Sequence, residues 1–68
     1  MDRDEILRIL RNYPGAQLER AAGTDDYRLV VPGSPIIPID WRTARVIIRD
    51  AGLRRAPAPV SVFAWRIA

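Results

Sequence analysis

The sequence contains no cysteine, no histidine and no lysine. Without cysteine there is no disulfide framework, so an intracellular setting is favoured over that of a small secreted scaffold. Without cysteine and histidine, a zinc site of the usual kind is excluded, and no glycine-rich phosphate loop is present. We therefore expect neither a metal ion nor a cofactor.

Long apolar runs are also missing. None approaches the roughly 18 residues that a membrane span requires, and the opening residues MDRDE are too acidic for a signal peptide. We expect a cytoplasmic protein with no membrane partner.

What the chain has is the composition of a folded protein. Of its 68 residues, 49% are hydrophobic and 28% charged, unlike a disordered segment. A chain of this length makes one domain, here 1–68, and such a domain buries only about 60% of the surface that its unfolded form exposes. Each large apolar residue is therefore first interpreted as structural.

All eleven basic residues are arginine, against eight carboxylates, which gives a formal net charge of +3. This excess permits binding to nucleic acid or to an acidic protein without requiring either. The exclusive use of arginine has a second reading, that of a GC-rich genome.

Apolar periodicity predicts two helices. The first covers 4–12, with Ile6, Ile9, Leu10 and Tyr13 along one face, and ends before Pro14. The second is capped by Asp40, buries a stripe of alanine and isoleucine from Ala44 to Ala51, and ends at Gly52 in a left-handed conformation.

Strands are predicted between and after these helices. Alternation indicates a half-buried strand over 26–31, and Pro32-Gly33 suits the centre of a type II turn. A short strand over 36–39 contains Pro38, which confines it to an edge or a strand end. The stretch 16–22 has the propensity of a helix but is left open between helix and strand, and 56–59 is a proline-rich connector before a last strand over 60–67.

These elements give an α+β fold: a small antiparallel sheet with two helices packed on it, in the order α-β-β-β-α-β. The last strand is apolar on both faces, so it is either central in the sheet or an edge that pairs with another chain. From the second alternative we expect a homodimer with an interface at Val62, Phe63 and Trp65.

The segments DEILRILRN, GTDDYRL and IPIDWRTARVIIRDAGL resemble the HicA family, small toxins of bacterial toxin–antitoxin pairs that cleave messenger RNA. The resemblance implies a HicA-like core over 1–55 with a double-stranded-RNA-binding-like fold, followed by the connector and final strand of 56–68. It places the family's catalytic histidine at Asp25 or Asp26, where this chain has no histidine. The resemblance therefore implies the fold without the nuclease activity.

Catalysis is not expected on other grounds either. Asp25 and Asp26, beside Tyr27 and Arg28, are conceivable as an acid–base or cation site. Adjacent strand residues point to opposite faces, however, and Thr24-Asp25-Asp26 after Gly23 has the composition of a polar turn.

The second helix carries a row of arginines at i, i+3 and i+7, opposite its apolar stripe. With further arginines elsewhere, the predicted partner-binding set is Arg28, Arg42, Arg45, Arg49, Arg54 and Arg55. Guanidinium groups match phosphate geometry, so we expect a non-catalytic module that binds structured RNA or DNA. The alternative is a phage-type inhibitor, similar in kind to anti-CRISPR proteins, that covers the surface of a protein or nucleoprotein complex.

Overall fold

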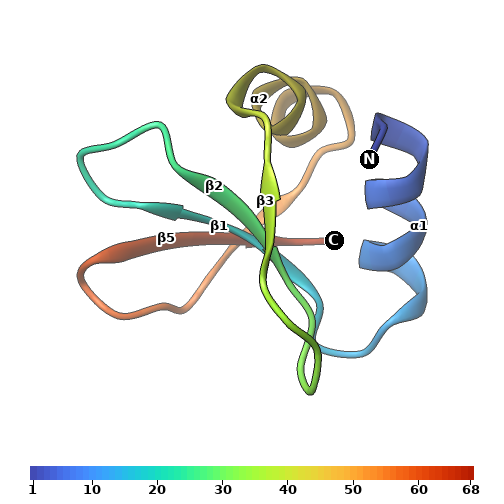
Figure 1. Ribbon diagram of the computed structural model, residues 1–68, viewed down its shortest axis with the longest axis horizontal. Coiled ribbons are helices and arrows are strands. Elements are labelled where there is room, and N and C mark those ends of the chain that lie inside the picture. The colour runs from blue at the N-terminus through green and yellow to red at the C-terminus, as the bar shows by residue number, and fades with distance from the viewer.

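The computed structural model describes residues 1–68 and contains two helices and a five-stranded antiparallel sheet (Figure 1). The elements follow the chain as α1 (Arg3–Asn12), β1 (Gln17–Ala21), β2 (Tyr27–Val30), β3 (Ile37–Ile39), α2 (Trp41–Asp50), β4 (Arg54–Ala56) and β5 (Val62–Arg66). The predicted α+β class and order are confirmed, with β4 as an additional strand before the last. Neither helix has the length and apolarity needed to cross a membrane.

Local capping explains where α1 begins. The Asp2 carboxylate accepts a hydrogen bond from the Glu5 amide at 2.9 Å, and the Glu5 side chain in turn accepts one from the Asp2 amide. At the other end Tyr13 has an extended backbone, as a residue before proline prefers, and the residue is 55% exposed. The predicted helix is confirmed, but Tyr13 lies outside its buried face and Leu7 lies within it.

The second helix has the ends that its sequence predicts. Asp40 accepts a hydrogen bond from the Thr43 amide at 3.3 Å, and Gly52 has φ of +64°. Ala44 and Ile47 are buried against the sheet.

Strand order decides the open questions of the sequence. The order is β3-β2-β1-β5-β4, which places β1 at the centre. Within the ambiguous stretch 16–22, Gln17–Ala21 is therefore a strand, because pairing on both sides and full burial of Leu18 outweigh its helix propensity. β5 pairs with β1 and with β4, so it is interior. The edge alternative for this strand is wrong.

The two edges are short. Pro38 lies in edge strand β3, as predicted, and the turn before it has Gly33 at φ of +81° with a hydrogen bond from the Ser34 amide to the Val31 carbonyl. The other edge, β4, includes residue 56, which the sequence assigned to the connector. The three residues of β4 are too few for an alternating pattern that would predict a strand. They form one because they pair with β5.

Both helices pack on one face of the sheet. Leu18, Leu29 and Trp65 are paired across the three inner strands and share that face, and they form one core cluster with residues of both helices. Ala64 is fully buried but belongs to the opposite face and not to this cluster. We call these two sides the helix side and the open face.

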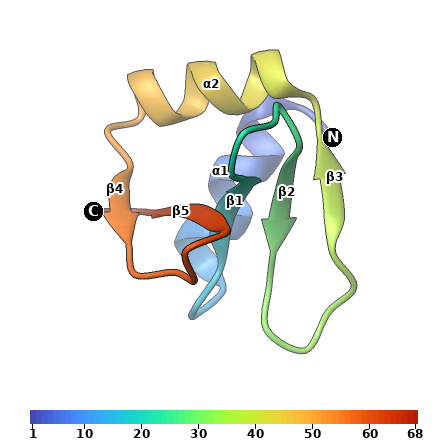
Figure 2. The same cartoon turned by 90° about the vertical axis from the view of Figure 1, so that its left-hand side faces the viewer.

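The helix α2 connects the two edge strands, so it must cross the whole sheet. Ten residues of helix are about 15 Å long, and four strand spacings are about 19 Å, so short links at each end suffice. Figure 2 shows α2 running from the β3 edge to the β4 edge, with α1 behind the strands. This crossing brings the arginines of α2 to the helix side of the sheet.

Candidate functional site

Most of the arginines have no carboxylate partner. Only two ion pairs occur, Arg28 with Glu19 at 3.5 Å and Arg49 with Asp50 at 2.7 Å. The other nine of the eleven arginines remain electrostatically uncompensated by direct contact. Several of them lie instead on aromatic rings.

Two arginines of α2 lie over the Trp41 ring. The guanidinium carbons of Arg42 and Arg45 lie 5.1 Å and 5.7 Å from the Trp41 ring centroid. All three residues are exposed on α2, and neither arginine donates a hydrogen bond within the chain. A guanidinium whose flat face rests on a ring keeps the in-plane N–H groups free for a partner. We call Trp41, Arg42 and Arg45 the α2 stack.

The third arginine of the predicted row is in a different state. Arg49 donates from Nε and Nη2 to the two Asp50 oxygens, at 2.7 Å and 3.3 Å. This hydrogen bonding raises the pKa of Arg49 and lowers the pKa of Asp50. Two of the five N–H groups of Arg49 are thus engaged by Asp50, which also balances its charge.

The structure separates Arg54 from Arg55. They are neighbours on β4, so they point to opposite faces. Arg55 lies on the helix side, with its guanidinium carbon 4.6 Å from the Phe63 centroid and 5.5 Å from that of Trp65. Arg54 is on the open face, paired across the ladder with Arg66.

Arg28 also lies on the open face. It is half-buried against Glu19, which also accepts a hydrogen bond from Gln17 at 2.6 Å. The Nε of Arg28 is buried without a hydrogen-bond partner. The six predicted arginines therefore divide: Arg42, Arg45, Arg49 and Arg55 lie on the helix side, and Arg28 and Arg54 on the open face.

Arg20 joins the helix-side group, and sequence reasoning missed it. Its guanidinium carbon lies 4.7 Å from the Phe63 centroid and 5.9 Å from that of Tyr27, and its Nη1 donates to the Thr24 carbonyl at 3.0 Å. No local pattern marks this residue. Only the pairing of Arg20 with Phe63 across β1 and β5 reveals it.

The residues of the predicted dimer interface do not share a surface. Trp65 is 9% exposed, and its ring lies 6.2 Å from that of Tyr27 in the core. Phe63 is half-buried on the same side, whereas Val62 lies on the open face. Because β5 is hydrogen-bonded along both sides, it cannot add a strand from a second copy. The homodimer stays a prediction, but it cannot form by pairing of β5 with a second copy.

The polar turn carries two adjacent, exposed carboxylates. Asp25 and Asp26 are exposed between β1 and β2, in a turn where Thr24 donates to the Ala21 carbonyl at 2.8 Å and accepts from the Asp26 amide at 3.0 Å. The chain contains no group of three acidic side chains that would hold a metal ion.

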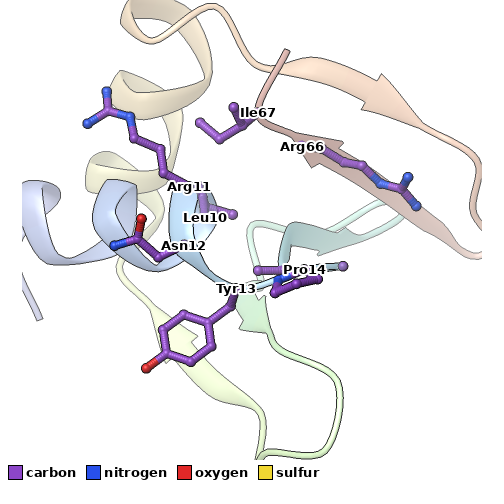
Figure 3. A pocket seen from close by; sticks show the side chains of 9 residues that line it. Leu10, Arg11, Asn12, Tyr13, Pro14, Arg66 and Ile67 are labelled. Carbon is purple, nitrogen blue, oxygen red and sulfur yellow. The ribbon is translucent and has the colours of Figure 1, made fainter.

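A hollow of about 240 Å³ lies beside the end of α1 (Figure 3). Its charged residues, Arg11 and Arg66, point away from each other and away from Asn12. Since its polar groups do not converge, this hollow is not a plausible ligand site.

Arginine–aromatic stacking is thus the distinctive feature of the surface. Four arginines, Arg20, Arg42, Arg45 and Arg55, make six such contacts with aromatic rings. Comparisons of the chain with protein-family models, with curated proteins and with solved structures each find no match.

Proposed function

We propose that this protein is a non-catalytic module of the cytoplasm that binds structured RNA or DNA through the α2 stack. The observation that carries the proposal is the state of Arg42 and Arg45, which are exposed, unpaired and supported by Trp41. A surface arginine that serves only solubility does not need such support.

Phosphate is the chemistry that suits these groups. A guanidinium fork forms two parallel, charge-assisted hydrogen bonds with phosphate oxygens. Stacking on Trp41 limits the side-chain freedom that binding would otherwise remove, so less conformational entropy is lost on association. Arg42 and Arg45 are three residues apart, about 4.5 Å along the helix axis, close enough to contact neighbouring phosphates of one strand.

Shape and charge are expected to dominate over base recognition. The α2 stack presents charged, planar donors on a short helix, and the deep, narrow major groove of an RNA duplex admits few side chains. We therefore expect binding with little sequence preference and with strong dependence on salt.

Catalysis is not part of the proposal. The turn that the HicA resemblance aligns with a catalytic histidine holds the exposed carboxylates of Asp25 and Asp26 in its place.

Fluorescence anisotropy tests the proposal. A labelled 20-base-pair RNA duplex and its DNA counterpart are titrated with the protein at 50 and 200 mM KCl. We expect salt-sensitive binding that is lost in Arg42→Glu/Arg45→Glu and kept in the control Arg8→Glu/Arg11→Glu, which makes the same change of charge at two exposed arginines of α1. Absence of salt-sensitive binding by the wild-type chain would overturn the proposal.

A second measurement separates this function from the alternative of a protein-directed inhibitor. Affinity capture from a bacterial extract is repeated after nuclease treatment. A nucleic-acid-binding module loses its co-purifying proteins when the nucleic acid is digested, whereas an inhibitor that covers a protein surface retains them.

A further inference from the structure

A second cluster of arginines lies on the sheet, apart from α2. β5 lies between β1 and β4, and Phe63 near its start is reached from both sides. Arg20 pairs directly with Phe63 from β1, and Arg55 extends over the same ring from β4. We call Arg20, Phe63 and Arg55 the Phe63 clamp.

The location of the clamp is fixed by the ends of the strands. The turn between β1 and β2 and the loop between β4 and β5 project together on the left of Figure 1, at the end of the sheet remote from α1. The Ala22 amide joins them by donating to the Ser61 carbonyl at 2.9 Å. The clamp is therefore held by backbone pairing on three strands rather than by a free loop.

The two positive charges of the clamp are close and unbalanced. Their guanidinium carbons lie 4.7 Å and 4.6 Å from one ring centroid, so they are at most about 9 Å apart, comparable with the Debye length of about 8 Å at physiological salt. Neither arginine has a carboxylate within 4.0 Å. A bound anion would relieve their mutual repulsion.

The free donors of the clamp identify the class of anion. Arg20 uses Nη1 on the Thr24 carbonyl, which orients the group and leaves Nε and Nη2 free, and Arg55 donates to nothing in the chain. With hydrogen bonds of about 2.8 Å, two guanidinium groups that share one phosphate have central carbons no more than roughly 8 Å apart. The upper bound of about 9 Å on the spacing in the clamp admits this arrangement.

A stacked nucleobase is disfavoured as the ligand. Guanidinium groups from both neighbouring strands already cover Phe63, and Tyr27 and Trp65 beside it are buried in the core.

We propose that the Phe63 clamp binds a single phosphate group of nucleic acid, either an internal phosphodiester or a terminal phosphate. The inference rests on the proposed function, because it assumes that the partner is a nucleic acid, and it adds a second contact point on the helix side. The clamp holds the phosphate through Arg20 and Arg55 while the α2 stack contacts another part of the backbone.

Arg54 provides a matched control, since it is the neighbour of Arg55 on the same strand and points to the opposite face. Arg55→Ala and Arg54→Ala remove the same charge from β4. Both variants are titrated against the RNA duplex, with its 5′ ends either phosphorylated or carrying hydroxyl groups, after thermal melting shows that they are folded. Arg55→Lys, which keeps the charge without the planar fork, is a third variant.

We expect Arg55→Ala to weaken binding about tenfold and Arg54→Ala to change it less than twofold, with Arg55→Lys restoring only part of the loss. If Arg55→Ala loses affinity for the phosphorylated and the hydroxyl-ended duplex alike, the clamp binds an internal phosphodiester. If it loses affinity for the phosphorylated duplex only, the clamp binds a terminal phosphate. Equal affinities of Arg55→Ala and Arg54→Ala for the duplex would overturn phosphate binding by the clamp. In that case the proposal for the α2 stack would still stand if Arg42→Glu/Arg45→Glu loses binding.

A titration independent of the duplex distinguishes failure of the clamp from failure of the proposed function. The Arg20 and Arg55 Nε–H resonances of the ¹⁵N-labelled protein are followed as uridine 5′-monophosphate is added. Shifts of both resonances in the wild-type chain, together with loss of the Arg20 shift in Arg55→Ala, support a phosphate site even if the duplex does not bind. No shift and no duplex binding refute both proposals.

Discussion

The ion pair at the end of α2 gives a sharp prediction about which arginines meet a nucleic acid. Arg45 is free to contact phosphate, whereas Arg49 is held by Asp50 through two hydrogen bonds. Arg45→Gln removes an available contact. The double variant Arg49→Gln/Asp50→Asn removes the ion pair without changing the net charge.

The expected magnitude follows from counterion release. On duplex DNA each phosphate contact contributes about 0.9 to the slope of log affinity against log salt, so losing one contact makes the fall in affinity between 50 and 200 mM salt about 3.5-fold smaller. Arg45→Gln is expected to show this reduction and Arg49→Gln/Asp50→Asn to keep the wild-type slope. Asp50→Asn alone releases Arg49 and is expected to steepen the slope by the same amount.

The assay is anisotropy with a 20-base-pair DNA duplex at four or more salt concentrations, with Arg8→Gln as the control. The pKa of Asp50 is lowered, so the ion pair is intact above the ordinary aspartate pKa and is lost only as pH falls through the lowered value. For each variant, the slope of log affinity against log salt should therefore be the same at about pH 6 and pH 8. If Arg49→Gln/Asp50→Asn flattens the slope as much as Arg45→Gln does, the ion pair does not remove Arg49 from the interface and the reasoning is wrong.

Three further predictions concern stability and are checked by thermal melting. Asp2→Ala removes the capping box of α1 and should cost about 1 kcal/mol, a fall in Tm of roughly 4–8 °C; no change would mean that α1 is fixed by packing alone. Gly15→Ala places a Cβ 3.0 Å from Pro32 Cγ at φ of +78° and should cost about 1–2 kcal/mol or more, whereas an unchanged Tm would refute the strain. Leu18→Ala opens a cavity beneath the central strand and should cost about 3 kcal/mol, with a loss below 1 kcal/mol contradicting its place in the core.

The sequence predicted what depends on neighbouring residues. Asp40 caps α2 by accepting from an amide three residues ahead, and Gly52 ends that helix because its backbone φ is positive. Pro38 is confined to an edge because it has no amide proton. Each of these interactions lies within one turn or one strand, so residue type and spacing are sufficient to identify it.

The candidate site was predicted only in part. The exposure of Arg42 and Arg45 follows from helical periodicity and was accessible from the sequence. The support from Trp41 is equally local, but an aromatic residue at a helix start is also compatible with burial. Pairing of Arg49 with the adjacent Asp50 depends on side-chain conformations that periodicity does not specify.

Tertiary structure alone decided the rest, because the decisive partners are far apart in the chain. Leu18 lies in a strand and not a helix because β2 and β5 both pair with β1, and β5 is interior because β4 covers its outer side. Arg20 and Arg55 are separated by more than thirty residues, yet both reach Phe63 through strand pairing. Residue types alone give a domain whose basic side chains are all arginine, and the strand order brings two of them, Arg20 and Arg55, to Phe63.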